Sequence, residues 1–328
     1  MSKLDETGID AIITWVDGYD PKHKEKRGEY LKKEYSSLSS ESIHPTRFNQ
    51  SGELTYCVRS ILKYAPWIRT IYIVTDSQTP PIYEMLKHSE YQDKLKLIDH
   101  KDIFSGFEDC LPTFNSISIE TMLWRIEDLS ERFIYFNDDC FLTRPVTEQD
   151  FFIDDKPVIR GEWRTQTAYK WQQKLRKWLQ LPFTPKIDSH RGLLERTARK
   201  VEYQKHYFYF PHAPFSLKKS TFAEYFSKYP DDLKNNIQYR FRDMHQFWPV
   251  ALVQLLTLKY HQGILDDQLE AVMVNGAFHQ LKKIKHRLDK VQPSKKIAFL
   301  CMQGIDSAPR NSQQYLLNWL EMHLGHLR

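Results

Sequence analysis

A short acidic motif follows one of the most apolar segments of this sequence. Asn137, Asp138 and Asp139 come directly after Phe133–Phe136, whose residues FIYF indicate a buried strand. Neighbouring strand residues point to opposite faces, so both aspartates reach one ion only if the strand has already ended. We expect one aspartate to bind Mg²⁺ together with substrate phosphate oxygens, while the other braces the loop. The alternative is a turn with solvated carboxylates.

Asp17 and His212 are further candidates, and each also has an ordinary structural explanation. Asp17 lies in TWVDGYDP, where it either contacts a bound nucleotide or only forms an Asp-Gly turn. His212 follows Phe210-Pro211, and a histidine held at such a turn can act as a general base or donate to a phosphate. The chain has 13 histidines, so a role in packing is the alternative for His212.

Two arginines come shortly before a predicted helix. Arg240 and Arg242 precede the segment Gln246–Leu258, and Pro249 suits the first turn of its helix. Arginines at this position add to the helix dipole and its free N–H groups, which makes an anion site. The alternative is a solvated basic turn in which Asp243 caps the helix.

The first half of the chain alternates between predicted strands and helices. This order predicts an α/β fold with a mostly parallel sheet flanked by helices. Such sheets bind ligands at the carboxyl ends of their strands, where Asp17 and the Asn137–Asp139 motif both fall. We therefore expect these residues to share one crevice. The predicted elements are Ile9–Val16, Glu53–Tyr64, Ile71–Val74, Leu95–Ile98, Ser118–Leu129 and Phe133–Phe136.

The character of the sequence changes after Phe151, where Trp-rich and Lys/Arg-rich helical segments replace most strand signals. We predict an α/β core at residues 1–160 and a helix-rich part at 161–296 that carries the His and Arg candidates. Residues 297–328 would return to the core. They include a strand at Ile297–Cys301, which we expect to rejoin the first sheet, and a closing helix around Gln313–His323.

The composition fits a globular protein. The chain has 328 residues, of which 41% are hydrophobic, and a net charge of +5. It has no apolar run long enough to span a membrane, and its first residues lack a secretory apolar region, so we expect a cytoplasmic protein. Cys57, Cys110, Cys140 and Cys301 form no CxxC pair, which favours reduced thiols over a disulfide framework or a zinc site.

Two basic amphipathic stretches bear on possible partners. Lys170–Leu179 and Leu281–Lys290 either rest on the anionic inner face of the cell membrane or pack their apolar sides on the domain, which is the commoner outcome. No recognition motif accompanies the charge, so nucleic acid is not an expected partner. The absence of GxxxxGK[ST] and GxGxxG disfavours a P-loop NTPase and an ordinary dinucleotide enzyme.

Four blocks of the sequence together resemble the Stealth family of sugar-phosphate transferases. This family includes bacterial capsule enzymes and the animal lysosomal-enzyme N-acetylglucosamine-1-phosphotransferase. The first three blocks are Ile9–Pro21, Arg47–Pro81 and Leu111–Leu142, and the region between the third and fourth matches through FPH and RFRD. The fourth block, Lys295–Asp306, departs most, because Gln303-Gly304 stands where many members have Asn-Asp.

The resemblance implies a GT-A-like core that binds a UDP-sugar donor, with Mg²⁺ or Mn²⁺ as cofactor. The family's Asn and second Asp fall on Asn137 and Asp139, and its catalytic His falls on His212. Its phosphate-binding Arg falls on Arg240 or Arg242, and the sequence leaves the register open.

Three further positions are implied to contact the bound donor. Ser116 and Glu120 fall on family positions in the third block, and Asp17 replaces an Asn found in some relatives. Asp139 is the first candidate for holding the metal, and Asp138 is the second.

We expect these residues to transfer a sugar-1-phosphate from a UDP-hexose or UDP-N-acetylhexosamine to a hydroxyl of an acceptor oligo- or polysaccharide. UMP would be released, and a phosphodiester would form in a capsular or cell-surface polysaccharide, beside capsule assembly proteins. His212 is the candidate for taking the acceptor proton. One alternative is a metal-dependent glycosyltransferase that releases UDP. Another is a non-catalytic polysaccharide-binding protein.

Overall fold

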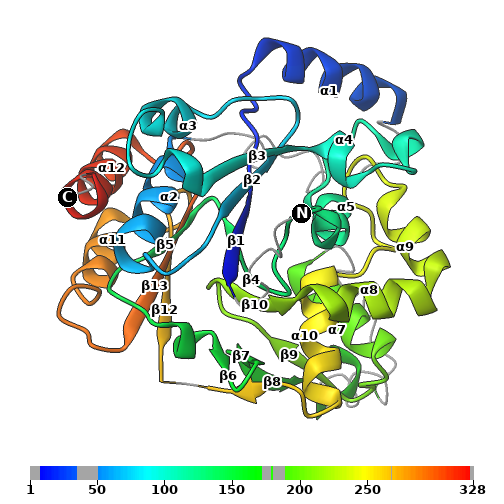
Figure 1. Ribbon diagram of the computed structural model, residues 1–328. Coiled ribbons are helices and arrows are strands. Elements are labelled where there is room, and N and C mark those ends of the chain that lie inside the picture. Colours follow the sequence, from blue (N-terminus) through cyan, green and yellow to red (C-terminus); the bar gives the residue numbers. More distant parts are fainter. Residues whose placement is uncertain (1–7, 35–50, 172–178, 180–188, 267, 326–328) are drawn as a thin grey trace.

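A mostly parallel five-stranded sheet forms the centre of the molecule (Figure 1). The computed structural model describes residues 8–34, 51–171, 179, 189–266 and 268–325. The strand order is β10-β4-β1-β2-β3, in which β1 to β4 run parallel and β10 runs antiparallel to β4. The strands are β1 (Ile9–Thr14), β2 (Ile71–Thr75), β3 (Leu95–Asp99), β4 (Arg132–Asn137) and β10 (Phe215–Lys218). This arrangement confirms the predicted α/β class.

The local patterns placed most elements of the first half correctly. Helix α2 spans Glu53–Tyr64, as predicted, and the four predicted strands form with ends within about two residues of expectation. The next predicted helix differs, because α5 covers only Ser116–Met122 and a 3₁₀ turn follows it. It begins earlier than predicted because the Asn115 side chain accepts a hydrogen bond from the N–H of Ile117 and so caps the helix.

Two hydrophobic cores lie on the two faces of the central sheet. Ile9, Ala11 and Ile13 of β1 face one core, whereas Ile12 faces the other, because successive strand residues point to opposite sides. Figure 1 shows α2, α11 (Leu281–Leu288) and α12 (Arg310–Leu324) on one side. On the other side lie α5, α7 (His190–Lys200), α8 (Lys219–Lys228), α9 (Pro230–Ile237) and α10 (Pro249–Lys259).

The predicted strand at Ile297–Cys301 forms, but its expected return to the first sheet is wrong. It is β13 (Ile297–Gln303), which pairs in parallel with β12 (Glu270–Asn275) and antiparallel with β5 (Cys140–Leu142). The chain turns after β4 and continues as β5, which belongs to a different sheet. Strand β13 pairs with β5 and therefore joins that second sheet. The resulting sheet packs into the same core as α2 and α12.

The part of the chain after residue 150 contains short strands that the sequence did not signal. They form two small sheets, from β6 (Phe152–Ile153), β7 (Lys156–Ile159) and β11 (Ile264–Leu265), and from β8 (Glu162–Thr165) and β9 (His206–Tyr209). Within the described ranges, the other α-helices are α1 (Pro21–Glu34), α3 (Pro81–Leu86) and α4 (His100–Ile103).

The two amphipathic stretches have different outcomes. Most of Lys170–Leu179 lies outside the described residues. The other stretch forms helix α11, which buries Ile284 and Leu288 and leaves its lysines exposed. Among the helices that the structure describes, none is both long enough and apolar enough to cross a bilayer.

Candidate active site

The Asn137–Asp139 motif forms a turn between two strands of different sheets. Strand β4 ends at Asn137, and β5 begins at Cys140. The carbonyl of Asp139 accepts a hydrogen bond of 3.0 Å from the N–H of Met302 in β13, which fixes the turn to the second sheet. The acidic side chains therefore lie at the carboxyl end of β4, where the sequence placed them.

Strand β10 brings His212 to this turn. Phe215 of β10 pairs with Tyr135 of β4, and the two strands are antiparallel. Residues before Phe215 therefore run past the end of β4, alongside the acidic turn. The interaction is visible in the electrostatics: burial raises the pKa of Asp139, and the nearby His212 imidazole opposes that rise. Strand pairing and this charge effect together place His212 near Asp139.

Two carboxylates that received no role from the sequence, those of Glu53 and Asp306, lie beside the motif. Burial raises the pKa of Glu53 to about 7, and repulsion from Asp139 and Asp306 adds to the rise. Burial, together with Asp139 and Glu53, raises the pKa of Asp138 well above its usual range. Glu53, Asp138, Asp139 and Asp306 form what we call the carboxylate cluster.

Local geometry explains how Glu53 and Asp306 arrive there. Glu53 lies one turn before Cys57 on α2, and the Cys57 thiol lies 3.7 Å from the carbonyl oxygen of Asn137, so this face of α2 covers the turn. Asp306 follows β13 after Gly304, whose φ of 63° turns the chain back toward the site. The weak fourth block of the sequence therefore belongs to the site region.

Arg242 connects to the motif through a chain of polar contacts. Its Nη2 donates a hydrogen bond of 2.7 Å to Oγ of Ser116, and its charge lowers the pKa of buried Glu120 against the effect of burial, leaving that pKa at about 7. Tyr135 interacts with Glu120, and its hydroxyl lies 3.2 Å from Oδ1 of Asn137.

The first arginine of the RFRD segment, Arg240, contacts a different part of the molecule. Arg240 donates from Nη2 to the carbonyl of Asp109 at 3.0 Å, and its guanidinium lies over the Tyr30 ring at 4.8 Å. These contacts hold α1 and the loop before α5 together. The sequence left the choice between Arg240 and Arg242 open, and only Arg242 contacts Ser116 and Glu120.

Asp17 has the geometry of the ordinary turn. Its Oδ1 accepts a hydrogen bond from the N–H of Tyr19, and its backbone exchanges two hydrogen bonds with the side chain of Gln78 after β2. Asp17 does lie beyond the carboxyl end of β1, beside the strand that carries the motif. Among the described residues, no recorded contact joins it to Asp139 or His212.

Sequence reasoning missed several residues of the site region. Glu53 begins the predicted helix Glu53–Tyr64, but its sequence context assigns it no role, because no local signal marks a buried glutamate. His190 stacks on His212 with ring centroids 6.2 Å apart, and Trp248 donates to Oε2 of Glu120 at 2.5 Å. Both contacts join segments distant in sequence, so neither has a spacing signature.

The donor set of the site fits a divalent cation. Carboxylate oxygens from Asp138 and Asp139 suit Mg²⁺, and burial raises the pKa of both carboxyls, so a bound cation would favour their charged forms. Asp139, Cys140 and Cys301 also offer ligand atoms within 4.8 Å of one another. Those two thiols are buried, and their soft sulfur atoms suit zinc better than magnesium.

Comparison with known proteins identifies family-specific regions in the first half of the chain. Models of the Stealth protein conserved regions 1 and 2 match residues 7–35 and 47–159. An exopolysaccharide phosphotransferase of Lactiplantibacillus plantarum, cps2G, is 32% identical over 277 residues, which are 77% of this chain and 77% of that protein. The chain belongs to the Stealth protein family.

Further matches to this Stealth protein differ in length or in sequence similarity. Exopolysaccharide phosphotransferase SCO6021 of Streptomyces coelicolor is 35% identical over 314 residues, but this chain spans only 54% of its length. A solved structure of the galactosyltransferase LgtC, in complex with donor and acceptor sugar analogs, is 12% identical, with a TM-score of 0.43 over 98% of both chains. A likeness this distant supports no argument about function.

Proposed function

We propose that this Stealth protein transfers a sugar-1-phosphate from a UDP-sugar to a hydroxyl of an acceptor glycan. The product would be a sugar–phosphate–sugar diester in an extracellular polysaccharide, and the by-product would be UMP. The observation that carries the proposal is the convergence of an imidazole, a carboxylate cluster and a guanidinium network at one end of β4. The printed names of the relatives, which are polysaccharide phosphotransferases, support the same reaction.

In the proposed reaction, the acceptor oxygen attacks the β-phosphorus of the donor, the one that bears the sugar. A new P–O bond forms to the acceptor, and the bond between the β-phosphorus and the bridging oxygen breaks, so that UMP leaves with the electron pair. His212 takes the proton of the acceptor hydroxyl. It is half-buried at the turn between β9 and β10, next to Asp139, which would stabilise the imidazolium that forms.

Charge on the transferred group must be neutralised by groups that are already in place. Arg242 is suited to this role because contacts to Ser116 and Glu120 fix its guanidinium near the end of β4. Mg²⁺ held by Asp139 and Asp138 would neutralise negative charge on the donor diphosphate. Asn137 would then be oriented by Tyr135, whose hydroxyl contacts its side-chain oxygen.

A donor labelled at the β-phosphate tests the proposed reaction. Sugar-phosphate transfer carries the label into the glycan and releases UMP, whereas an ordinary glycosyltransferase leaves the label in UDP. A third outcome, binding of glycan with no consumption of any UDP-sugar, would favour a non-catalytic protein. Label in UDP, with none in the polymer, would overturn the proposal.

A further inference from the structure

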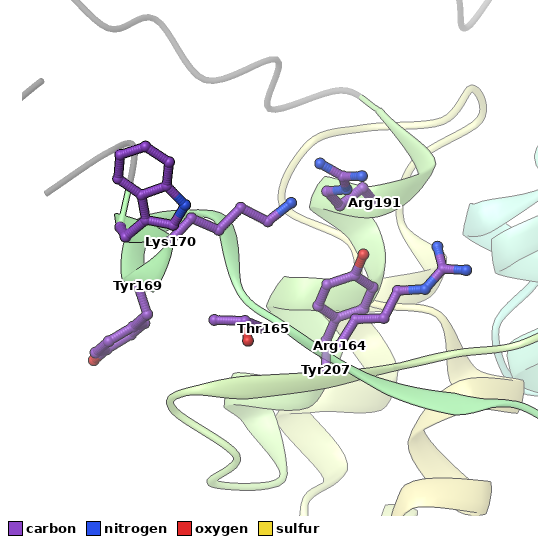
Figure 2. Close-up of a pocket in the computed structure, with 7 residues that line it drawn as sticks. Arg164, Thr165, Tyr169, Lys170, Arg191 and Tyr207 are labelled. Carbon is purple, nitrogen blue, oxygen red and sulfur yellow. The ribbon is translucent and has the colours of Figure 1, made fainter. Parts of the chain in front are cut away.

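A concave region lies between the paired strands β8 and β9, the segment after β8 and the start of α7 (Figure 2). Its volume is about 470 Å³, and we call it the cationic pocket. Figure 2 shows Lys170 reaching across the pocket toward Arg191, above Arg164 and Tyr207, while Tyr169 lies at the opposite rim. Thr165 and Trp171 also line the pocket.

The charged residues that line the pocket are all cationic, namely Arg164, Lys170 and Arg191. Among the residues that the structure describes, no ion pair is recorded for Lys170 or Arg191. Arg164 is paired with Glu162 through an Nε–Oε1 hydrogen bond of 2.8 Å, and its guanidinium lies 3.6 Å from the centre of the Tyr209 ring. These contacts hold Arg164 in one orientation, whereas the other two cations remain available to an anion.

Large aromatic side chains at the pocket are exposed to solvent. Trp171 is 70% exposed and Tyr169 is 41% exposed, so both rings present apolar surface to solvent. A flat aromatic face offers apolar surface to the C–H face of a sugar ring. A pocket that combines such faces with cations suits a glycan that carries negative charge.

The pocket lies next to the candidate active site. Strand β9 leads from Tyr207 in the pocket toward His212, and five residues span at most about 18 Å. On the other wall, Arg191 follows His190, whose ring stacks on that of His212. A polymer whose end reaches His212 can therefore place an earlier unit in the pocket.

We propose that the cationic pocket is an acceptor subsite for a glycan that already contains a phosphodiester. This inference rests on the proposed function, because each sugar-phosphate transfer adds one negative charge to the acceptor chain. Lys170 and Arg191 bind that phosphate, and Trp171 and Tyr169 stack on the adjoining sugars. The subsite favours a growing chain over a neutral starter.

The test compares two oligosaccharides of equal length, one phosphodiester-linked and the other neutral. In the full chain, the double variant Lys170→Glu, Arg191→Glu should raise the KM for the charged acceptor about tenfold or more, with kcat and the donor KM nearly unchanged. The KM for the neutral acceptor should change little. The matched control is Lys282→Glu, Lys285→Glu on α11, which makes the same charge change on another surface and should leave every constant as in the wild type.

Binding of the same two oligosaccharides, followed by calorimetry, separates this inference from the proposed function. Preferential binding of the charged oligosaccharide that is lost in the pocket variant supports the subsite even if the label experiment shows no sugar-phosphate transfer. Trp171→Ala should weaken binding of both oligosaccharides. Equal binding of the two by the wild type, or unchanged binding by the pocket variant, overturns the inference.

Discussion

The carboxylate cluster and the cationic pocket are opposite in charge and differ in construction. The cluster joins α2, the turn after β4 and the segment after β13, which are widely separated in the sequence. The pocket uses residues of two paired strands, the segment after β8 and the start of α7, and its Tyr169 and Trp171 side chains are exposed. In the carboxylate cluster, half-buried carboxylates repel one another. In the cationic pocket, Lys170 and Arg191 are accessible to solvent.

The two regions should therefore differ in how strongly a ligand of opposite charge stabilises them. Crowded carboxylates with raised pKa values gain most from a cation, because it replaces repulsion with attraction. Solvated lysine and arginine side chains gain less, because each contact is screened by water. We therefore expect the largest effects of substitution in the cluster and its neighbours, and smaller effects in the pocket.

The strongest test of this comparison removes a reacting group. His212→Ala and Asp139→Asn should each lower turnover by roughly a hundredfold or more while leaving the fold intact, because the base or the cation ligand is lost. The measurement is steady-state UMP release together with circular dichroism. His286→Ala, an exposed histidine on α11, is the control and should retain full turnover. Near-normal turnover in His212→Ala would remove that residue from the mechanism.

Cation binding should distinguish the two regions through stability. Mg²⁺ at a hundred times its Kd should stabilise the wild type by about 2.7 kcal/mol, because it binds the folded state and not the unfolded one. Asp139→Asn should lose this shift, whereas Lys170→Glu should retain it. Thermal unfolding with and without Mg²⁺ measures the effect. An equal shift in Asp139→Asn would place the cation elsewhere.

Ionisation of the buried Glu120 carboxyl should make the protein less stable as the pH rises. Burial raises the pKa of Glu120 from 4.5 to about 7, so the folded state retains a proton that the unfolded state releases. The free energy of unfolding should therefore decrease between about pH 4.5 and pH 7, by up to about 3 kcal/mol for this group.

Denaturant titrations of the wild type and Glu120→Gln across this range measure the contribution of that carboxyl. The variant should show the shallower pH dependence, since its amide does not titrate. Identical slopes in the two proteins would mean that Glu120 ionises normally in the folded state. Lys170→Glu is the control from the pocket and should follow the wild type.

The smallest expected effects concern the arginines. Arg242→Lys should lower turnover about tenfold, because lysine cannot reproduce the fixed fork that contacts Ser116. Arg240→Lys should leave turnover within a few-fold of the wild type, since its contacts join α1 to the loop before α5. Arg191→Lys should change only the KM for a charged acceptor. A larger loss in Arg240→Lys than in Arg242→Lys would reverse this assignment.

Individual strands and helices, and the position of the acidic motif at a strand end, could be predicted from local sequence patterns. The apolar run before Asn137 predicted β4, and the helical spacing from Glu53 to Tyr64 predicted α2. The position of the acidic motif at a strand end followed from the same patterns, because burial on both faces of a sheet demands a continuous apolar run.

Which of these residues lie close together in space depends on the tertiary structure. Antiparallel pairing of β10 with β4 brings His212 to Asp139, and the turn at Gly304 brings Asp306 to Glu53. Arg240 and Arg242 are two residues apart in the sequence, yet their side chains make contacts to different segments. A linear pattern records what each residue prefers, whereas these contacts depend on strand pairing and packing between segments far apart in the chain.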